Sequence, residues 1–170
     1  MALIPQMVDA VPVIAAGGVM DGRGIAAAIV LGASAAQMGT AFLTCEEAGI
    51  AAAYKETILA AGVDQTRMTR AFSGRPARGI INRLLREYET AGEDVLPFPL
   101  QNALTWPLRT EASKRNRPEY LSLWAGQGVR MARRTSAAEL MAKLRDELSA
   151  AVESLAGDRL GTAGGHHGNT

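Results

Sequence analysis

The segments Val11-Pro12-Val13-Ile14-Ala15-Ala16-Gly17-Gly18-Val19 and Ala35-Ala36-Gln37-Met38-Gly39-Thr40-Ala41-Phe42 decide how this chain folds. Each is a short apolar run that ends in glycine, which is typical of a strand buried in a parallel sheet. The stretch between them is long enough for one helix, and Asp21 is suited to cap that helix over residues 22–31. A second helical pattern covers residues 46–61. The order strand, helix, strand, helix predicts an α/β fold with a parallel sheet.

The second half of the chain has a different pattern, in which helices dominate. Ser73–Pro76 predicts a turn. Apolar residues at spacings of three and four predict an amphipathic helix over residues 77–90. The proline-rich stretch that begins at Pro97 and runs past Pro107 is expected to be irregular. Leu121–Gly128 is expected to form a loop of small residues with one large aromatic side chain.

The last predicted helix begins at a capping-box sequence, Ser136-Ala137-Ala138-Glu139, and ends at Gly157. The residues after it are rich in glycine and are expected to form a disordered tail. We therefore expect three parts: strand–helix units over residues 1–62, a mostly helical segment over 63–156, and a tail over 157–170.

The composition is that of an ordinary soluble globular chain: 170 residues, 48% hydrophobic and 21% charged. The formal net charge of +1 predicts neither nucleic acid nor an anionic membrane as a partner. The single cysteine, Cys45, forms no internal disulfide, which favours a reducing, cytoplasmic compartment. Residues 24–45 carry no charge, but glycine and polar residues interrupt them, so we predict a helix, a turn and a strand rather than a membrane span.

Glycines at the ends of the two predicted strands indicate a phosphate site. Gly17 and Gly18 follow the first strand, and Gly39 and Thr40 follow the second. Backbone N–H groups at such turns can converge on an anion, and the Thr40 hydroxyl can add a further donor. The same residues are equally compatible with two tight turns that bind nothing, and the pattern alone leaves both interpretations open.

Several blocks of the sequence resemble the nitronate monooxygenase family, formerly called 2-nitropropane dioxygenase. The two strands and their glycine turns match that family's last two strands, and the helix between them begins with a similar Gly22-Arg23-Gly24-Ile25. The resemblance extends to about Leu155. Its later blocks are Phe72-Ser73-Gly74-Arg75-Pro76-Ala77-Arg78, Leu96-Pro97-Phe98-Pro99-Leu100-Gln101-Asn102 and Ser122-Leu123-Trp124-Ala125-Gly126-Gln127-Gly128.

The resemblance implies the C-terminal part of a (β/α)8 TIM barrel, made of its last two βα units, followed by a mostly helical segment. It implies FMN as cofactor and the oxidation of alkyl nitronates by O2 to carbonyl compounds and nitrite. It also implies that Trp124 and Gln127 lie near the substrate, in a loop over the active site. The FMN contacts that it implies are Gly17, Gly18, Gln37, Met38, Gly39 and Thr40.

The family's catalytic histidine lies in a segment before the first strand, and this chain lacks that segment, so no catalytic residue is assigned. His166 and His167 follow two glycines near the end of the chain, and we expect them to be incidental. No metal site is predicted, because two adjacent histidines without further ligands rarely close one. We expect the chain to be part of a longer product, or to be completed by another chain or by a homo-oligomer.

The sequence also leaves two other functions open. One is an NAD(P)H-dependent flavin reductase of the enoyl-thioester type, which would use the same phosphate site. The other is a non-catalytic fragment or assembly partner, which the absent histidine favours.

Overall fold

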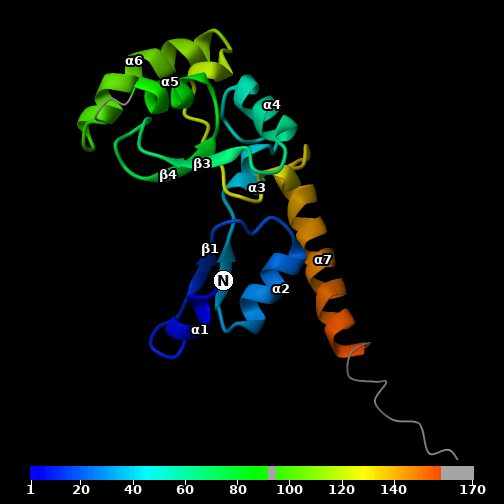
Figure 1. The fold of residues 1–170 in the computed structure, drawn as a ribbon. Coiled ribbons are helices and arrows are strands. Elements are labelled where there is room, and N and C mark those ends of the chain that lie inside the picture. Colours follow the sequence, from blue (N-terminus) through cyan, green and yellow to red (C-terminus); the bar gives the residue numbers. More distant parts are fainter. Residues whose placement is uncertain (92–94, 158–170) are drawn as a thin grey trace, which may run out of the picture.

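The computed structural model describes residues 1–91 and 95–157, and these form an α/β fold (Figure 1). A parallel pair of strands, β1 and β2, pairs Ile14 with Ala35 and Ala16 with Gln37. Helix α2 connects the two strands, which confirms the predicted strand–helix–strand order. The elements of this part are α1 (Ile4–Met7), β1 (Ile14–Ala16), α2 (Gly22–Val30) and β2 (Ala35–Gln37).

Helix α2 begins where the sequence predicts, because the Asp21 side chain accepts a 2.9 Å hydrogen bond from the Gly24 N–H. Ala15 of β1 is buried with Ala28 of this helix. The opposite face of the strands is not covered by the described residues, and Ile14 is 63% exposed there. The prediction that these strands are buried was therefore wrong for one of their two faces.

The predicted helix over residues 46–61 is shorter than expected. A short helix α3 (Thr40–Leu43) follows β2, and α4 (Ala52–Ala60) begins six residues after Glu46. Between them, Cys45 forms a β-bridge with Thr135, and the Glu46 N–H donates a 3.1 Å hydrogen bond to the Thr135 carbonyl. This pairing with a distant segment takes the backbone groups that a helix starting at Glu46 would need.

The predicted helix over residues 77–90 was wrong in its first part. β3 (Thr66–Thr69) and β4 (Ala77–Ile80) form an antiparallel hairpin, and α5 (Arg83–Ala91) begins only afterwards. The predicted turn at Ser73–Pro76 is confirmed, and it lies between these strands. The hairpin persists because β4 also pairs on its other side, where the Ile80 N–H donates to the Leu123 carbonyl at 2.8 Å.

The stretch expected to be irregular contains helix α6 (Leu100–Lys114), which carries Pro107 within it. Two buried side chains attach this helix to the turn after β3. The Gln101 amide donates to the Ala71 carbonyl at 2.7 Å, and the Thr105 hydroxyl donates to the Phe72 carbonyl at 2.6 Å. These tertiary contacts offset the hydrogen bond that a proline removes from a helix.

The last helix, α7 (Ala137–Gly157), starts with the predicted capping box. The Glu139 N–H donates to the Ser136 hydroxyl and the Ser136 N–H to the Glu139 carboxylate, each at 3.2 Å. Helix α7 runs alongside α2 (Figure 1). Its apolar stripe is buried only in its first half, at Leu140 and Leu144. The predicted tail lies outside the described residues, apart from its first residue, and so do His166 and His167.

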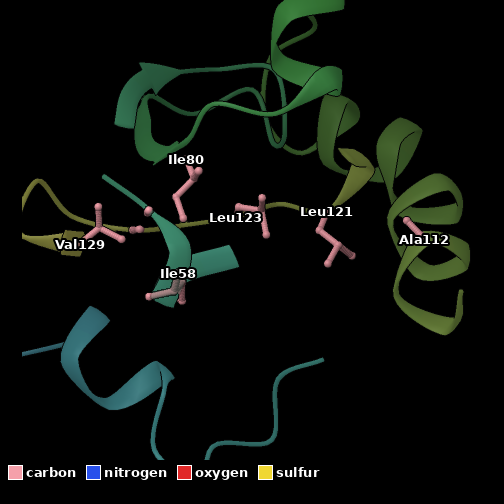
Figure 2. Packing of buried hydrophobic residues seen from close by; sticks show 8 residues of the cluster. Ile58, Ile80, Ala112, Leu121, Leu123 and Val129 are labelled. Atoms are coloured by element: carbon pink, nitrogen blue, oxygen red, sulfur yellow. The ribbon is translucent and has the colours of Figure 1, made fainter. Parts of the chain in front are cut away.

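The largest buried apolar cluster joins α4, β4, α6 and the Leu121–Val129 segment (Figure 2). Short 3-10 helices lie on either side of this segment, η1 (Pro118–Tyr120) and η2 (Val129–Met131). The segment thus rests on a packed platform rather than forming a free loop. The buried members of the cluster are Ile58, Ala61, Ile80, Ala112, Leu121, Leu123, Ala125 and Val129. None of the described helices is long and apolar enough to cross a bilayer.

Candidate functional site

The ends of β1 and β2 lie side by side, because Ala16 is paired with Gln37. Gly17 and Gly18 therefore emerge beside Met38 and Gly39. Gly17 has φ +98° and Gly18 has φ +75°, a backbone region that side chains rarely adopt. The two strands end in the glycine turns that the sequence predicts, and both turns are at the same edge of the sheet.

The positions that side chains would occupy on these turns are open. A Cβ built on Gly17, Gly18 or Gly39 would meet no described atom within 4 Å. Within residues 1–91 and 95–157, no acceptor is hydrogen-bonded to the N–H groups of Gly18, Gly39 or Thr40. Exposed N–H groups around an open space are what an anion with several oxygens requires.

Thr40 connects this edge to a distant segment of the chain. Its hydroxyl oxygen accepts a 2.9 Å hydrogen bond from the Gly126 N–H, 86 residues further along. A hydroxyl group that accepts one bond keeps its own hydrogen for another acceptor. The Thr40 O–H is therefore available to an anion beside Gly39, while Gly126 lies directly over the strand ends.

A second contact holds the same segment against the first glycine turn. A Cβ on Gly128 would lie 2.9 Å from the Gly18 carbonyl oxygen and 2.5 Å from Cγ of Met20. Such distances leave no room for any side chain at this position. Gly126 and Gly128 therefore bring the Ser122–Gly128 segment into contact with the ends of both strands.

The remaining predicted site residues have different environments. Gln37 and Gln127 are exposed, and Gln127 stands between the two glycines that contact the strand ends. Met38 is half-buried and packs against the cluster formed by Met20, Ala41, Cys45, Leu140 and Leu144, so only its backbone could face a ligand at the strand ends. The half-buried Trp124 packs its ring edge-on against Phe72, with centroids 4.8 Å apart and an interplanar angle of 85°.

The pKa values of Glu147 and Cys45 are shifted by their surroundings. Burial would raise the pKa of Glu147, but the Gly22 N–H and Arg133 outweigh it and hold that pKa below its usual value. Burial raises the pKa of the Cys45 thiol, which disfavours the thiolate that a nucleophile needs. Among the described residues there is no cluster of three side chains that could hold a metal ion.

Sequence reasoning missed two residues of this region. These are Gly126, which lies within a block that resembles the family, and Tyr54. The Tyr54 hydroxyl donates a 2.6 Å hydrogen bond to the Trp124 carbonyl. The signal for Gly126 was the run of small residues after Trp124, which permits a close approach between backbones. No local signal identifies Tyr54, since its partner is 70 residues away.

Comparison with known proteins finds one family model and several relatives that match this chain. The family model described as "Nitronate monooxygenase" matches residues 1–147. A probable nitronate monooxygenase of Bacillus subtilis (strain 168) is 50% identical over 132 residues, which cover 76% of this chain and 38% of the relative. A probable nitronate monooxygenase of Staphylococcus saprophyticus is 44% identical over 139 residues, which cover 81% of this chain and 39% of that relative. The chain thus spans about two fifths of these relatives.

Two solved structures are also similar to this chain. A nitroalkane oxidase from Streptomyces ansochromogenes superimposes with a TM-score of 0.84 at 44% identity, over 91% of this chain and 44% of the other. FabK from Thermotoga maritima superimposes with a TM-score of 0.77 at 31% identity, over 91% and 50%.

Proposed function

Because this chain belongs to the nitronate monooxygenase family, as the match over residues 1–147 shows, we propose that its two strand ends bind the phosphate of FMN. Members of this family are FMN-dependent flavoenzymes. The observation that carries the proposal is the open space at Gly17, Gly18 and Gly39, bordered by N–H groups that have no acceptor among the described residues.

The donors at this edge suit a phosphate monoester. The N–H groups of Gly18, Gly39 and Thr40 and the Thr40 hydroxyl can each donate to a phosphate oxygen. Hydrogen bonds to a charged acceptor contribute about 1.5–3 kcal/mol each. Several such bonds can hold a dianion without a lysine, and the fixed backbone groups lose no side-chain entropy when they bind. Gln37 and Met38 would contribute through their position in the same turn.

We assign residues 1–62 to the last two βα units of a (β/α)8 barrel, and residues 63–156 to the segment that carries the loop over its active site. The bare face of β1 at Ile14 supports this assignment, because it would face the interior of such a barrel. In a complete barrel the carboxyl ends of the strands form the active-site edge, which is where Gly18 and Gly39 lie.

For the intact protein we propose the oxidation of alkyl nitronates by O2 to carbonyl compounds and nitrite. FMN supplies the electron transfer when it is bound. The residues of this chain orient the cofactor through its phosphate. The Ser122–Gly128 segment covers the site, with Trp124 and Gln127 on the substrate side. We assign no catalytic base among the described residues of this chain.

The test compares FMN with riboflavin, which lacks the phosphate. We expect the chain to quench FMN fluorescence with a Kd at least about tenfold lower than for riboflavin, because only FMN engages the strand ends. In amide NMR spectra, FMN should shift the signals of Gly18, Gly39 and Thr40. Equal affinities for the two flavins, or binding that leaves these amides unmoved, would show that the phosphate is not held here.

Anaerobic reduction of the bound flavin then separates the possible activities. Bleaching by an alkyl nitronate supports the monooxygenase. Bleaching by NAD(P)H supports the alternative function, a reductase of the enoyl-thioester type. Bound FMN that neither reagent reduces would identify this chain as a non-catalytic part of an assembly.

A further inference from the structure

We propose that Gly126 is a ligand-facing residue of the phosphate site, so that the Ser122–Gly128 segment forms a third wall beside the two strand ends. This inference rests on the proposed FMN site and adds a residue that recognises the phosphate. The ligand class is a phosphate monoester dianion, of which the FMN phosphate is one.

The geometry at Gly126 distinguishes a packing glycine from a ligand-facing one. A Cβ on Gly126 would lie 3.5 Å from the Gly18 nitrogen and 3.6 Å from the Thr40 hydroxyl oxygen. Both are ordinary van der Waals distances, so the folded chain could accept a methyl group there. The methyl group would nevertheless stand next to two of the proposed phosphate donors and would compete with a ligand oxygen that binds both.

Gly128, two residues later, shows the contrast. A Cβ there would come within 2.5 Å of Met20 Cγ and 2.9 Å of the Gly18 carbonyl oxygen. Gly128 is therefore glycine because the fold leaves no room for a side chain. At Gly126, packing would tolerate a side chain and does not explain why the residue is glycine. We infer that a ligand occupies the free volume at that position.

The Thr40 hydroxyl links this wall to the strand ends. It accepts the Gly126 N–H at 2.9 Å, so its own hydrogen is directed to another acceptor. The Thr40 hydroxyl thereby fixes the Ser122–Gly128 segment and also supplies a donor to the phosphate. An anion that polarises the Thr40 O–H also strengthens the bond that this oxygen accepts, since linked hydrogen bonds reinforce one another. Binding of a phosphate should therefore change the NMR chemical shift of the Gly126 amide.

The wall is held from behind by contacts that do not involve the ligand. The Trp124 carbonyl accepts the Tyr54 hydroxyl at 2.6 Å, and the Ala125 N–H donates to the Arg78 carbonyl at 3.2 Å. Ala125 itself is buried. With this support, a methyl group on Gly126 cannot simply move away with the segment, and its effect should stay local to the site.

The experiment uses the full chain and the substitution Gly126→Ala, with Gly49→Ala as the matched control. Gly49 is exposed, and a Cβ there would meet no described atom within 4 Å. We expect Gly126→Ala to raise the Kd for FMN by about tenfold and to leave the Kd for riboflavin and the unfolding temperature unchanged. Gly49→Ala should change none of these quantities.

A second measurement follows the Gly126 amide in NMR spectra while inorganic phosphate or FMN is added. Its signal should shift in the parent chain and in Thr40→Ser, which keeps the hydroxyl. In Thr40→Val, which removes the hydroxyl at nearly constant volume, the shift should be lost.

The outcomes separate this inference from the function on which it rests. If Gly126→Ala binds FMN as the parent does, or weakens FMN and riboflavin equally, the third wall is wrong even though the strand ends bind phosphate. If the parent chain shows no preference for FMN over riboflavin, the proposed FMN site itself is wrong. The proposed role of Gly126 is then wrong as well.

Discussion

The hydroxyl of Tyr54 donates a 2.6 Å hydrogen bond to the backbone carbonyl of Trp124. Tyr54 lies on α4, and Trp124 lies in the segment that contacts both strand ends. Burial raises the pKa of Tyr54 above its usual range, so the hydroxyl keeps its proton and remains a donor at neutral pH. The bond therefore joins helix α4 to the Ser122–Gly128 segment of the candidate site.

Tyr54→Phe should lower the free energy of unfolding by about 1–2 kcal/mol, because the half-buried Trp124 carbonyl loses its partner. Urea denaturation measures this change. Tyr88→Phe is the control, since Tyr88 is also half-buried and its hydroxyl has no hydrogen bond to a described residue. A loss of equal size in both variants would mean that the Tyr54 hydroxyl contributes nothing specific.

Gly39→Val should raise the Kd for FMN roughly tenfold or more, because the side chain would fill space that the phosphate needs. The backbone of Gly39 has φ −99°, so valine is not excluded by its own conformation. The measurement is the quenching of FMN fluorescence. Gly49→Val, at another open position, should bind FMN as the parent chain does. Unchanged affinity in Gly39→Val would remove this turn from the site.

Gly22→Ala should destabilise the chain by about 1–3 kcal/mol, as overpacking does. A Cβ at this position would lie 2.3 Å from the Leu148 backbone nitrogen, and the backbone of α7 cannot move aside as a flexible side chain could. Thermal unfolding followed by circular dichroism measures the effect. Gly49→Ala serves as the control. An unchanged unfolding temperature in Gly22→Ala would contradict the close contact between Gly22 and the backbone of α7.

Glu147→Gln should make the chain less sensitive to acid. The Gly22 N–H and Arg133 hold the folded-state pKa of Glu147 below its unfolded value, in spite of burial. The ionised carboxylate therefore contributes to stability above the unfolded pKa of about 4.3, and that contribution is lost as the pH falls through the lower folded value.

Urea denaturation between about pH 7 and pH 3 measures this loss. The variant should be less stable than the parent by about 1 kcal/mol at neutral pH, and the difference should shrink in acid. Glu153→Gln is the control, because Glu153 is exposed on the same helix and has no ion pair among the described residues. A constant difference across the pH range would contradict the assignment.

Features that depend on a few neighbouring residues could be predicted from the sequence. The Asp21 cap and the Ser136–Glu139 capping box formed as expected, because each uses side chains and N–H groups within three residues of one another. The glycine turns at Gly17 and Gly18 also formed, since positive φ angles there require the residue type that the sequence has.

Features that depend on distant partners were mispredicted. Residues 77–80 have helical spacing but form a strand, because β3 on one side and Leu123 on the other satisfy their backbone groups. Helix α6 forms despite Pro107, because Gln101 and Thr105 bond to the turn after β3. In both cases tertiary hydrogen bonds outweighed local preference.

The sequence by itself determined the α/β order, the glycine ends of the two strands and the resemblance to a family of flavoenzymes, since these reside in residue type and spacing along the chain. Only the tertiary structure decided that Gly126 lies over Gly18 and Thr40. Thr40 and Gly126 are 86 positions apart in the sequence, and no local signal predicts their contact. It arises because α4, β4 and α6 bury a shared apolar cluster and thereby position the segment that carries Gly126.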